Sequence, residues 1–192
     1  SSGELTPVVR DSDAVQCSAW VAPDGRLYLR TSLDAPRFRL CVADPATPTA
    51  WTELVGEQPD SVLDDVHWLD GSLVLLRTRH AVSELHLPSP ATGEHLGEVP
   101  MPGTGSVHGL STTDALTVAD RDVLWFGWSD FVTPLSVYRY SPATGRAELD
   151  VAAPGRVTLP ELTATVTCCR SGWLDWRTAP GARPTACSAA AI

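Results

Sequence analysis

One serine of the sequence lies in a glycine-rich segment and could, from its residue type, act as a nucleophile. Residues Gly103–Gly109 read GTGSVHG and place Ser106 at their centre. A serine nucleophile on a strand-to-helix elbow needs Gly-x-Ser-x-Gly, because that strained turn leaves no room for side chains beside the serine. Here Thr104 and His108 occupy the two positions that the motif reserves for glycine. No histidine follows His108 to complete a triad in the order Ser, Asp, His. We interpret Gly105 and Gly109 as residues that let a strand approach its neighbours closely.

The histidines and carboxylates lack the spacing of a metal or acid–base site. His80, His86 and His95 match no metal-ligand motif, and prolines and a glycine interrupt the segment that joins them, so we expect surface or edge positions. The Asp64–Asp65 pair has no partner group in the sequence and is predicted to begin a strand, not to perform acid–base chemistry. Three further carboxylates are expected to be solvated loop residues without calcium: Asp11, Asp13 and Asp24.

Aromatic residues are dense in one segment. They could form a surface on which a ligand stacks, but packing in a core is favoured, because such rings build the interiors of sheet proteins. These residues are Trp125, Phe126, Trp128 and Phe131. The cysteines have no zinc-like spacing and are interpreted as reduced thiols, with a redox or metal role as the alternative. They are Cys17, Cys41, Cys168, Cys169 and Cys187. The sequence therefore predicts no catalytic residue, no cofactor-binding residue and no metal ligand.

Composition narrows the class of protein. The chain has 192 residues, of which 43% are hydrophobic and 19% charged, as in folded globular proteins. Its net charge of −9 argues against a nucleic acid or an anionic membrane as partner. No apolar run approaches the roughly 20 residues of a membrane span, and no signal peptide is visible. We expect a cytoplasmic protein.

A short polar phrase recurs and indicates repeated structural units. SPATG occurs at Ser89–Gly93 and at Ser141–Gly145, and the related DPAT occurs at Asp44–Thr47. Each copy follows a short apolar run, a polar break and a second run that alternates apolar and polar residues, which is typical of a half-buried strand. The phrase itself has the composition of a tight turn: Ser or Asp opens it, Pro fixes φ, and Gly takes the left-handed position.

Each repeat contains enough turns and apolar runs for four short antiparallel strands. A preceding strand ends in Asp-Gly at Asp24–Gly25 and at Asp70–Gly71, a strong hairpin signal. No long segment keeps a helical period. Four-stranded units of about 45–50 residues are typical of β-propeller blades. We therefore predict an all-β fold with about three four-stranded antiparallel blades, and a β-sandwich is the alternative.

About three blades cannot close a ring, because propellers have about four to eight. The end blades of such a segment would leave open strand edges and apolar faces. Either another chain completes the ring, or the sequence is a piece of a longer protein.

Three stretches resemble blades of one known family. They are WVAPDGRLYLRTSLDAPRFRLCVADPATPTAWTELVGE (Trp20–Glu57), VLDDVHWLDGSLVLLRTRHAVSELHLPSPATGE (Val62–Glu94) and GSVHGLSTTDALTVADRDVLWFGWSDFVTPLSVYRYSPATG (Gly105–Gly145). They resemble the last blades of the propeller in the prolyl oligopeptidase family of serine peptidases, and the resemblance covers about Glu4 to Leu162. It implies a seven-bladed propeller that covers an α/β-hydrolase domain, admits short peptides for cleavage after proline, and keeps folded proteins out.

The resemblance also implies that an Asp-Gly-Thr turn and then the hydrolase domain follow the last blade. Residues 163–192 do not fit this expectation. VTCCRS fits a strand, but Trp173 and Trp176 and a run rich in Ala, Pro and Arg follow without any period. We interpret 1–162 as the propeller segment and 163–192 as an irregular tail. The tail is explained by a shifted reading frame starting near Cys168 or, alternatively, by a divergent natural C-terminus.

The function implied by this resemblance is that of a non-catalytic propeller fragment. In the intact enzyme the propeller would filter peptide substrates by size and contact a C-terminal α/β-hydrolase domain. The chain lacks that domain and should be inactive alone. The alternative is a stand-alone propeller-like module that binds other proteins without peptidase function.

Overall fold

The computed structural model describes residues 7–9, 15–69, 71–112 and 123–155. Within them the chain forms twelve strands and no helix, so the predicted all-β class is confirmed. None of the described residues forms a helix that could cross a membrane. The predicted tail at 163–192 lies outside the described residues, as do Asp11, Asp13 and the last three cysteines.

The strands form three four-stranded antiparallel sheets, each in sequence order, as predicted for blades. The first sheet contains β1 (Cys17–Val21), β2 (Leu27–Thr31), β3 (Arg39–Ala43) and β4 (Thr52–Val55). The second contains β5 (Val62–Leu69), β6 (Ser72–Arg79), β7 (Val82–Pro88) and β8 (His95–Glu98). The third contains β9 (Ser106–Thr112), β10 (Leu124–Ser129), β11 (Ser136–Ser141) and β12 (Arg146–Val151).

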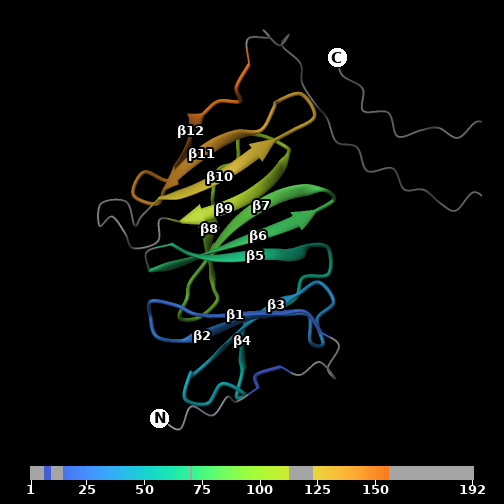
Figure 1. Cartoon of the computed structure of the whole chain (residues 1–192), viewed down its shortest axis with the longest axis vertical. Helices are drawn as coiled ribbons and strands as arrows, with labels where there is room; N and C mark the ends of the chain where they lie inside the picture. Colours follow the sequence, from blue (N-terminus) through green and yellow to red (C-terminus); the bar gives the residue numbers. More distant parts are fainter. Residues whose placement is uncertain (1–6, 10–14, 70, 113–122, 156–192) are drawn as a thin grey trace, which may run out of the picture.

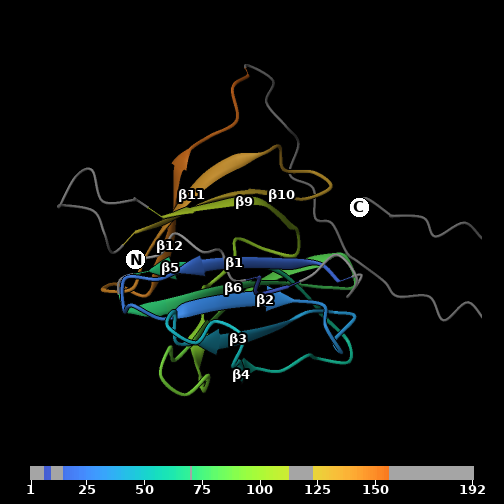
Figure 2. The ribbon, with the colours of Figure 1, turned by 60° about the horizontal axis from the view of Figure 1, so that its bottom comes forward.

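The sheets follow one another along the long axis of the molecule (Figure 1), with the second between the other two. Figure 2 shows the strands of the first sheet in order, from β1 at one edge to β4 at the other. The first strand of the third sheet, β9, contacts both β5 and β7 of the second sheet. The three sheets are consecutive blades of a partial propeller.

The recurring phrase forms the turn between the third and fourth strands of each blade, as predicted. In the second blade, Gly93 N–H donates to the Ser89 carbonyl at 2.8 Å, and in the third blade Gly145 N–H donates to the Ser141 carbonyl at 2.9 Å. Both glycines have positive φ, at 74° and 65°. In the first blade, Asp44 Oδ1 accepts a hydrogen bond from Ala46 N–H at 2.8 Å, so its side chain replaces the serine.

The second sheet buries apolar side chains on both faces. Along β6, Leu73 and Leu75 pack with residues of β2 and β3 in the first sheet. The alternate residues Val74 and Leu76 pack with residues of β10 and β11 in the third sheet. Adjacent residues of a strand point to opposite faces, so this continuous apolar run supplies two interfaces at once.

Polar contacts also join the first and second sheets. Arg26, in the β1–β2 turn, donates from Nη2 to the Pro90 carbonyl at 2.7 Å and to Tyr28 Oη at 2.6 Å. Tyr28 Oη in turn donates to Asp24 Oδ2 at 2.8 Å. Asp24 was predicted to be a solvated loop residue. This prediction is confirmed, because Asp24 is exposed in the β1–β2 turn, where its carboxylate also accepts hydrogen bonds from Arg26 and Tyr28 of the same hairpin.

Gly105 and Gly109 were predicted to let a strand approach its neighbours closely, and the structure confirms this for Gly105 only. A Cβ on Gly105 would lie 2.4 Å from the Ser129 carbonyl oxygen and 2.8 Å from the Trp128 ring, so close packing does require glycine there. A Cβ on Gly109 would meet no atom within 4 Å. Gly109 instead has φ of 143° and lies where the β9–β10 register shifts, so it serves an irregularity of the strand.

Candidate functional site

A pocket of about 180 Å³ opens at the rim between the second and third blades. The end of the β6–β7 hairpin supplies one wall, and the start of β9 and the end of β10 supply the others. Its lining residues are Ala81, Val82, Thr104, Gly105, Ser106, His108, Ser129, Asp130 and Phe131. The pocket therefore gathers the glycine-rich segment that the sequence singled out and residues from two further connections.

The histidine of this segment is paired with a serine that the sequence did not single out. His108 Nε2 lies 2.7 Å from Ser129 Oγ. Ser106, the serine of the glycine-rich segment, donates instead to the Ala81 carbonyl at 3.4 Å. Ser106 and Ser129 are cross-strand partners of β9 and β10. Nothing in the sequence marks Ser129, because only this strand register brings it to His108.

The serine–histidine pair has no third group that would orient the imidazole. Asp130 is adjacent, but its Oδ1 accepts hydrogen bonds from the N–H groups of Val132 and Thr133. Burial raises the pKa of the Asp130 carboxyl, but these hydrogen bonds outweigh it, so the pKa lies below its ordinary value. Within the described part of the chain, no carboxylate is paired with His108. An activated nucleophile needs a base that is itself held by a partner, and this site lacks that arrangement.

The pocket offers an exposed aromatic ring and polar groups to a ligand. Phe131 is 73% exposed and presents a large apolar surface at the mouth. His108 and Ser129 offer hydrogen-bonding groups beside it. An aromatic ring next to a few polar groups is a common arrangement where a protein contacts a peptide.

The aromatic segment is divided between core and surface. Phe126 and Trp128 are buried between the second and third sheets, as predicted. Tyr138 stacks on Phe126 with ring centroids 5.7 Å apart and meets Trp128 edge-on. The prediction of a core position is wrong for Phe131, because this residue lies in the connection after β10 and not in the strand itself.

The aspartate pair lies near the start of a strand, as predicted, but one member has a partner. Asp64 and Asp65 belong to β5, and Asp65 Oδ2 lies 3.0 Å from His67 Nε2. The hydrogen bond with His67 lowers the pKa of Asp65 most, and burial opposes it only in part. Asp65 is mostly exposed, and Asp65 and His67 form an ordinary surface ion pair.

The three histidines predicted at surface or edge positions lie in the second blade. His80 is exposed in the β6–β7 turn, His86 lies in β7, and His95 lies in the outermost strand, β8. The structure brings the last two together with Glu98, a grouping that their sequence spacing did not indicate.

Cys17 and Cys41 are free thiols in the first sheet, which agrees with the interpretation as reduced cysteines. Burial raises the pKa of both thiols. A raised pKa keeps a thiol protonated and unreactive at neutral pH.

Comparison with known proteins agrees with the arrangement of the three sheets. The family described as prolyl oligopeptidase, N-terminal beta-propeller domain, matches residues 1–152. A structure from a study of two prolyl endopeptidases and their inter-domain dynamics is 27% identical with a TM-score of 0.64, and the match covers 79% of this chain and 22% of that chain. No curated protein matches the chain.

Two further structures share the fold at lower identity. Prolyl oligopeptidase B from Galerina marginata, without ligand, is 19% identical with a TM-score of 0.66, and the match covers 79% of this chain and 22% of that one. The same enzyme bound to a 35mer hydrolysis and macrocyclization substrate is 18% identical with a TM-score of 0.64, covering 79% and 21%. The chain thus spans about a fifth of the length of the solved structures that it matches. By its match over residues 1–152, the chain belongs to the prolyl oligopeptidase family, within the N-terminal β-propeller domain.

Proposed function

We propose that this chain supplies non-catalytic blades to the propeller of a prolyl-oligopeptidase-like serine peptidase. The propeller would limit which peptides reach the catalytic domain, and that domain would cleave short peptides after proline. The observation that carries this proposal is the match of three consecutive sheets to the propeller family over residues 1–152. The likeness to a prolyl endopeptidase structure at 27% identity supports the activity of the whole enzyme.

The chain alone would then be inactive. The Ser129–His108 pair is the described arrangement that comes nearest to a nucleophile and its base, and no carboxylate orients its histidine. We propose that the rim pocket around this pair contacts peptides through Phe131 and the two polar side chains, and performs no bond cleavage.

A peptidase assay on the full chain tests this proposal. The purified chain is incubated with a reporter peptide that releases a chromophore after Gly-Pro, with buffer as a blank and His108→Ala as the matched variant. We expect both proteins to match the blank. Turnover by the unmodified chain that His108→Ala abolishes would show that the pair is catalytic and would overturn the proposal.

Exposed apolar side chains favour one alternative, a module that binds other proteins or further copies of itself. Large apolar residues are exposed on and near the third blade: Phe131, Leu135, Leu149 and Val151. Open sheet faces of this kind are suited to pair with another chain. Size-exclusion chromatography with light scattering separates the two functions: a stable oligomer of defined size supports the module, and a monomer or polydisperse aggregates support the fragment.

We further propose a cytoplasmic location and no nucleic-acid or membrane partner. The free thiols at Cys17 and Cys41 support a reducing compartment. The net charge of −9 opposes binding to phosphate-rich surfaces. Fractionation of cells that express the tagged chain tests the location, and recovery in an oxidising compartment would contradict it.

A further inference from the structure

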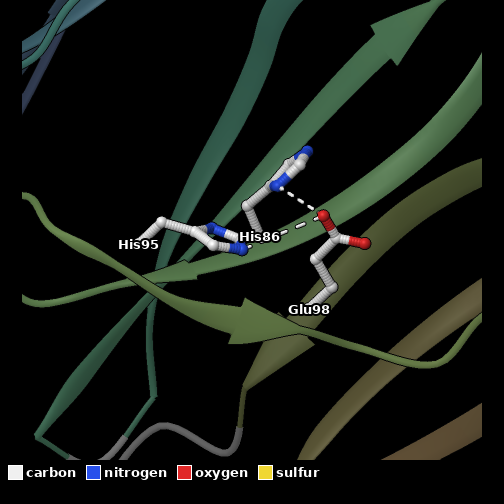
Figure 3. A group of neighbouring side chains, drawn as sticks. All are labelled: His86, His95 and Glu98. Atoms are coloured by element: carbon white, nitrogen blue, oxygen red, sulfur yellow. Dashed lines mark ion pairs between the residues drawn. The ribbon is translucent and has the colours of Figure 1, made fainter.

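Two histidines and a glutamate converge at the outer edge of the second blade. His86 in β7 and Glu98 in β8 are cross-strand partners, and a register shift at the end of β7 brings His95 beside them. His86 Nδ1 lies 3.5 Å from Glu98 Oε1, and His95 Nε2 lies 3.9 Å from the same oxygen. Figure 3 shows the carboxylate of Glu98 pointing toward both imidazoles. We propose that His86, His95 and Glu98 bind a zinc ion.

Two of the three separations, those to Glu98 Oε1, are near the value for a tetrahedral site. Ligand atoms about 2.0–2.1 Å from zinc lie about 3.3 Å from one another in tetrahedral geometry. The two distances to Glu98 Oε1 exceed this value by a few tenths of an ångström, and the three ligand atoms all lie within 4.8 Å of one another. The side chains of His95 and Glu98 are 56% and 61% exposed, so small rotations can close the remaining gap.

A fourth residue, Glu84, lies behind His86. His86 Nε2 lies 3.1 Å from Glu84 Oε2. The two ring nitrogens of His86 thus face two carboxylates, Nε2 that of Glu84 and Nδ1 that of Glu98. Arg79 Nε lies within ion-pair distance of the same carboxylate, 3.3 Å from Glu84 Oε1. A carboxylate behind a ligating histidine is the usual second layer of a zinc site.

The ligand set favours zinc over harder ions. Two imidazoles and one carboxylate suit zinc, whereas calcium and magnesium prefer oxygen ligands alone. Three protein ligands leave a fourth position for water. The bound ion would tie the short outermost strand β8 to β7. Without an ion, Glu98 would form exposed ion pairs, which contribute little to stability.

Metal titration of the full chain tests the proposal. The chain is treated with a chelator, dialysed, and titrated with zinc chloride by calorimetry. Cobalt(II) then serves as a spectroscopic probe of tetrahedral coordination. We expect one zinc per chain and an intense visible cobalt spectrum. No zinc binding, or a weak octahedral cobalt spectrum, would overturn the proposal.

Variants separate this site from adventitious binding. Glu98→Gln and His95→Ala change exposed side chains and should weaken zinc binding at least tenfold with an unchanged circular dichroism spectrum. Glu84→Gln should weaken it by about 10- to 100-fold, as for other residues behind zinc ligands. His80→Asn is the matched control, because His80 is an exposed histidine of the same blade and asparagine tolerates its positive φ of 51°. Equal zinc affinity in Glu98→Gln, His80→Asn and the unmodified chain would contradict the proposal.

Discussion

The two copies of SPATG form the same turn but have different surroundings. In the second blade, a Cβ on Gly93 would lie 1.9 Å from the Leu54 carbonyl oxygen of the first blade. In the third blade, a Cβ on Gly145 would meet no atom within 4 Å. Five identical residues thus produce one local structure, while the position of the blade in the series decides whether the turn also forms part of an interface.

The same difference extends to whole sheets. The second sheet is covered on both faces, and its central strand β6 reads as a continuous apolar run. In the third sheet, β10 alternates buried and half-buried residues, and β12 has no buried residue. Strands buried on both faces lose alternation, and strands covered on one face keep it. The apolar pattern of each strand therefore reports how many neighbours its blade has.

Removal of a buried side chain from the second sheet should have the largest effect on the free energy of unfolding. Leu75 is 2% exposed and packs against the first sheet, whereas Leu149 in β12 is 54% exposed. We expect Leu75→Ala to lower the free energy of unfolding by about 2–5 kcal/mol, and Leu149→Ala by less than about 0.5 kcal/mol. Urea unfolding followed by circular dichroism measures both. Equal losses of unfolding free energy in the two variants would mean that β12 is covered as completely as β6.

The two turn glycines offer a sharper test, because the local sequence is identical. An alanine in the left-handed region costs about 1–2 kcal/mol at either position. Gly93→Ala must also displace the backbone of Leu54, and such overpacking adds about 1–3 kcal/mol. We therefore expect Gly93→Ala to be clearly more destabilising than Gly145→Ala in the same urea experiment. Equal losses would show that the turn of the second blade does not contact the first.

Arg26 should have a smaller effect on the same interface. Its guanidinium donates to the Pro90 carbonyl and pairs with Asp24, so we expect Arg26→Ala to cost about 1–2 kcal/mol. Arg139 pairs with Glu148 at the exposed side of the third blade, and Arg139→Ala should cost less than about 0.5 kcal/mol. Thermal unfolding should show a lower Tm for Arg26→Ala. A Tm for Arg139→Ala below that of Arg26→Ala would contradict this prediction.

The smallest expected effect is the pH dependence of Asp24. Burial raises the pKa of this carboxyl, but hydrogen bonds from Arg26 and Tyr28 outweigh it, so the pKa is lowered in the folded state. A lowered pKa contributes stability above the unfolded value of about 3.9, and this contribution is lost as the pH falls through the folded value. Asp24→Asn should therefore destabilise the chain at pH 6, with the difference from the unmodified chain shrinking toward pH 2.5. A difference in stability that is constant between these pH values would show that the lowered pKa of Asp24 is not its cause.

Much of the fold could be predicted from the sequence, because local turn chemistry repeats. Asp-Gly and SPATG mark the connections, and alternation marks strands such as β11. Contacts between sequence-distant strands could not be predicted. The Ser129–His108 pair depends on the register of β9 with β10, and the histidine cluster depends on the register shift between β7 and β8. The exposure of Phe131 likewise follows from its place in the connection after β10, which no local pattern encodes.

Native-state hydrogen exchange tests most directly that these are consecutive propeller blades with the second enclosed by the other two. The matched strands are β6 and β10, because each is the second strand of its sheet and pairs on both sides. Local hydrogen bonding is therefore alike, and coverage by neighbouring sheets differs. We predict that amides of β6 exchange more slowly than those of β10. Equal rates, or slower exchange in β10, would contradict a second blade buried between two neighbours.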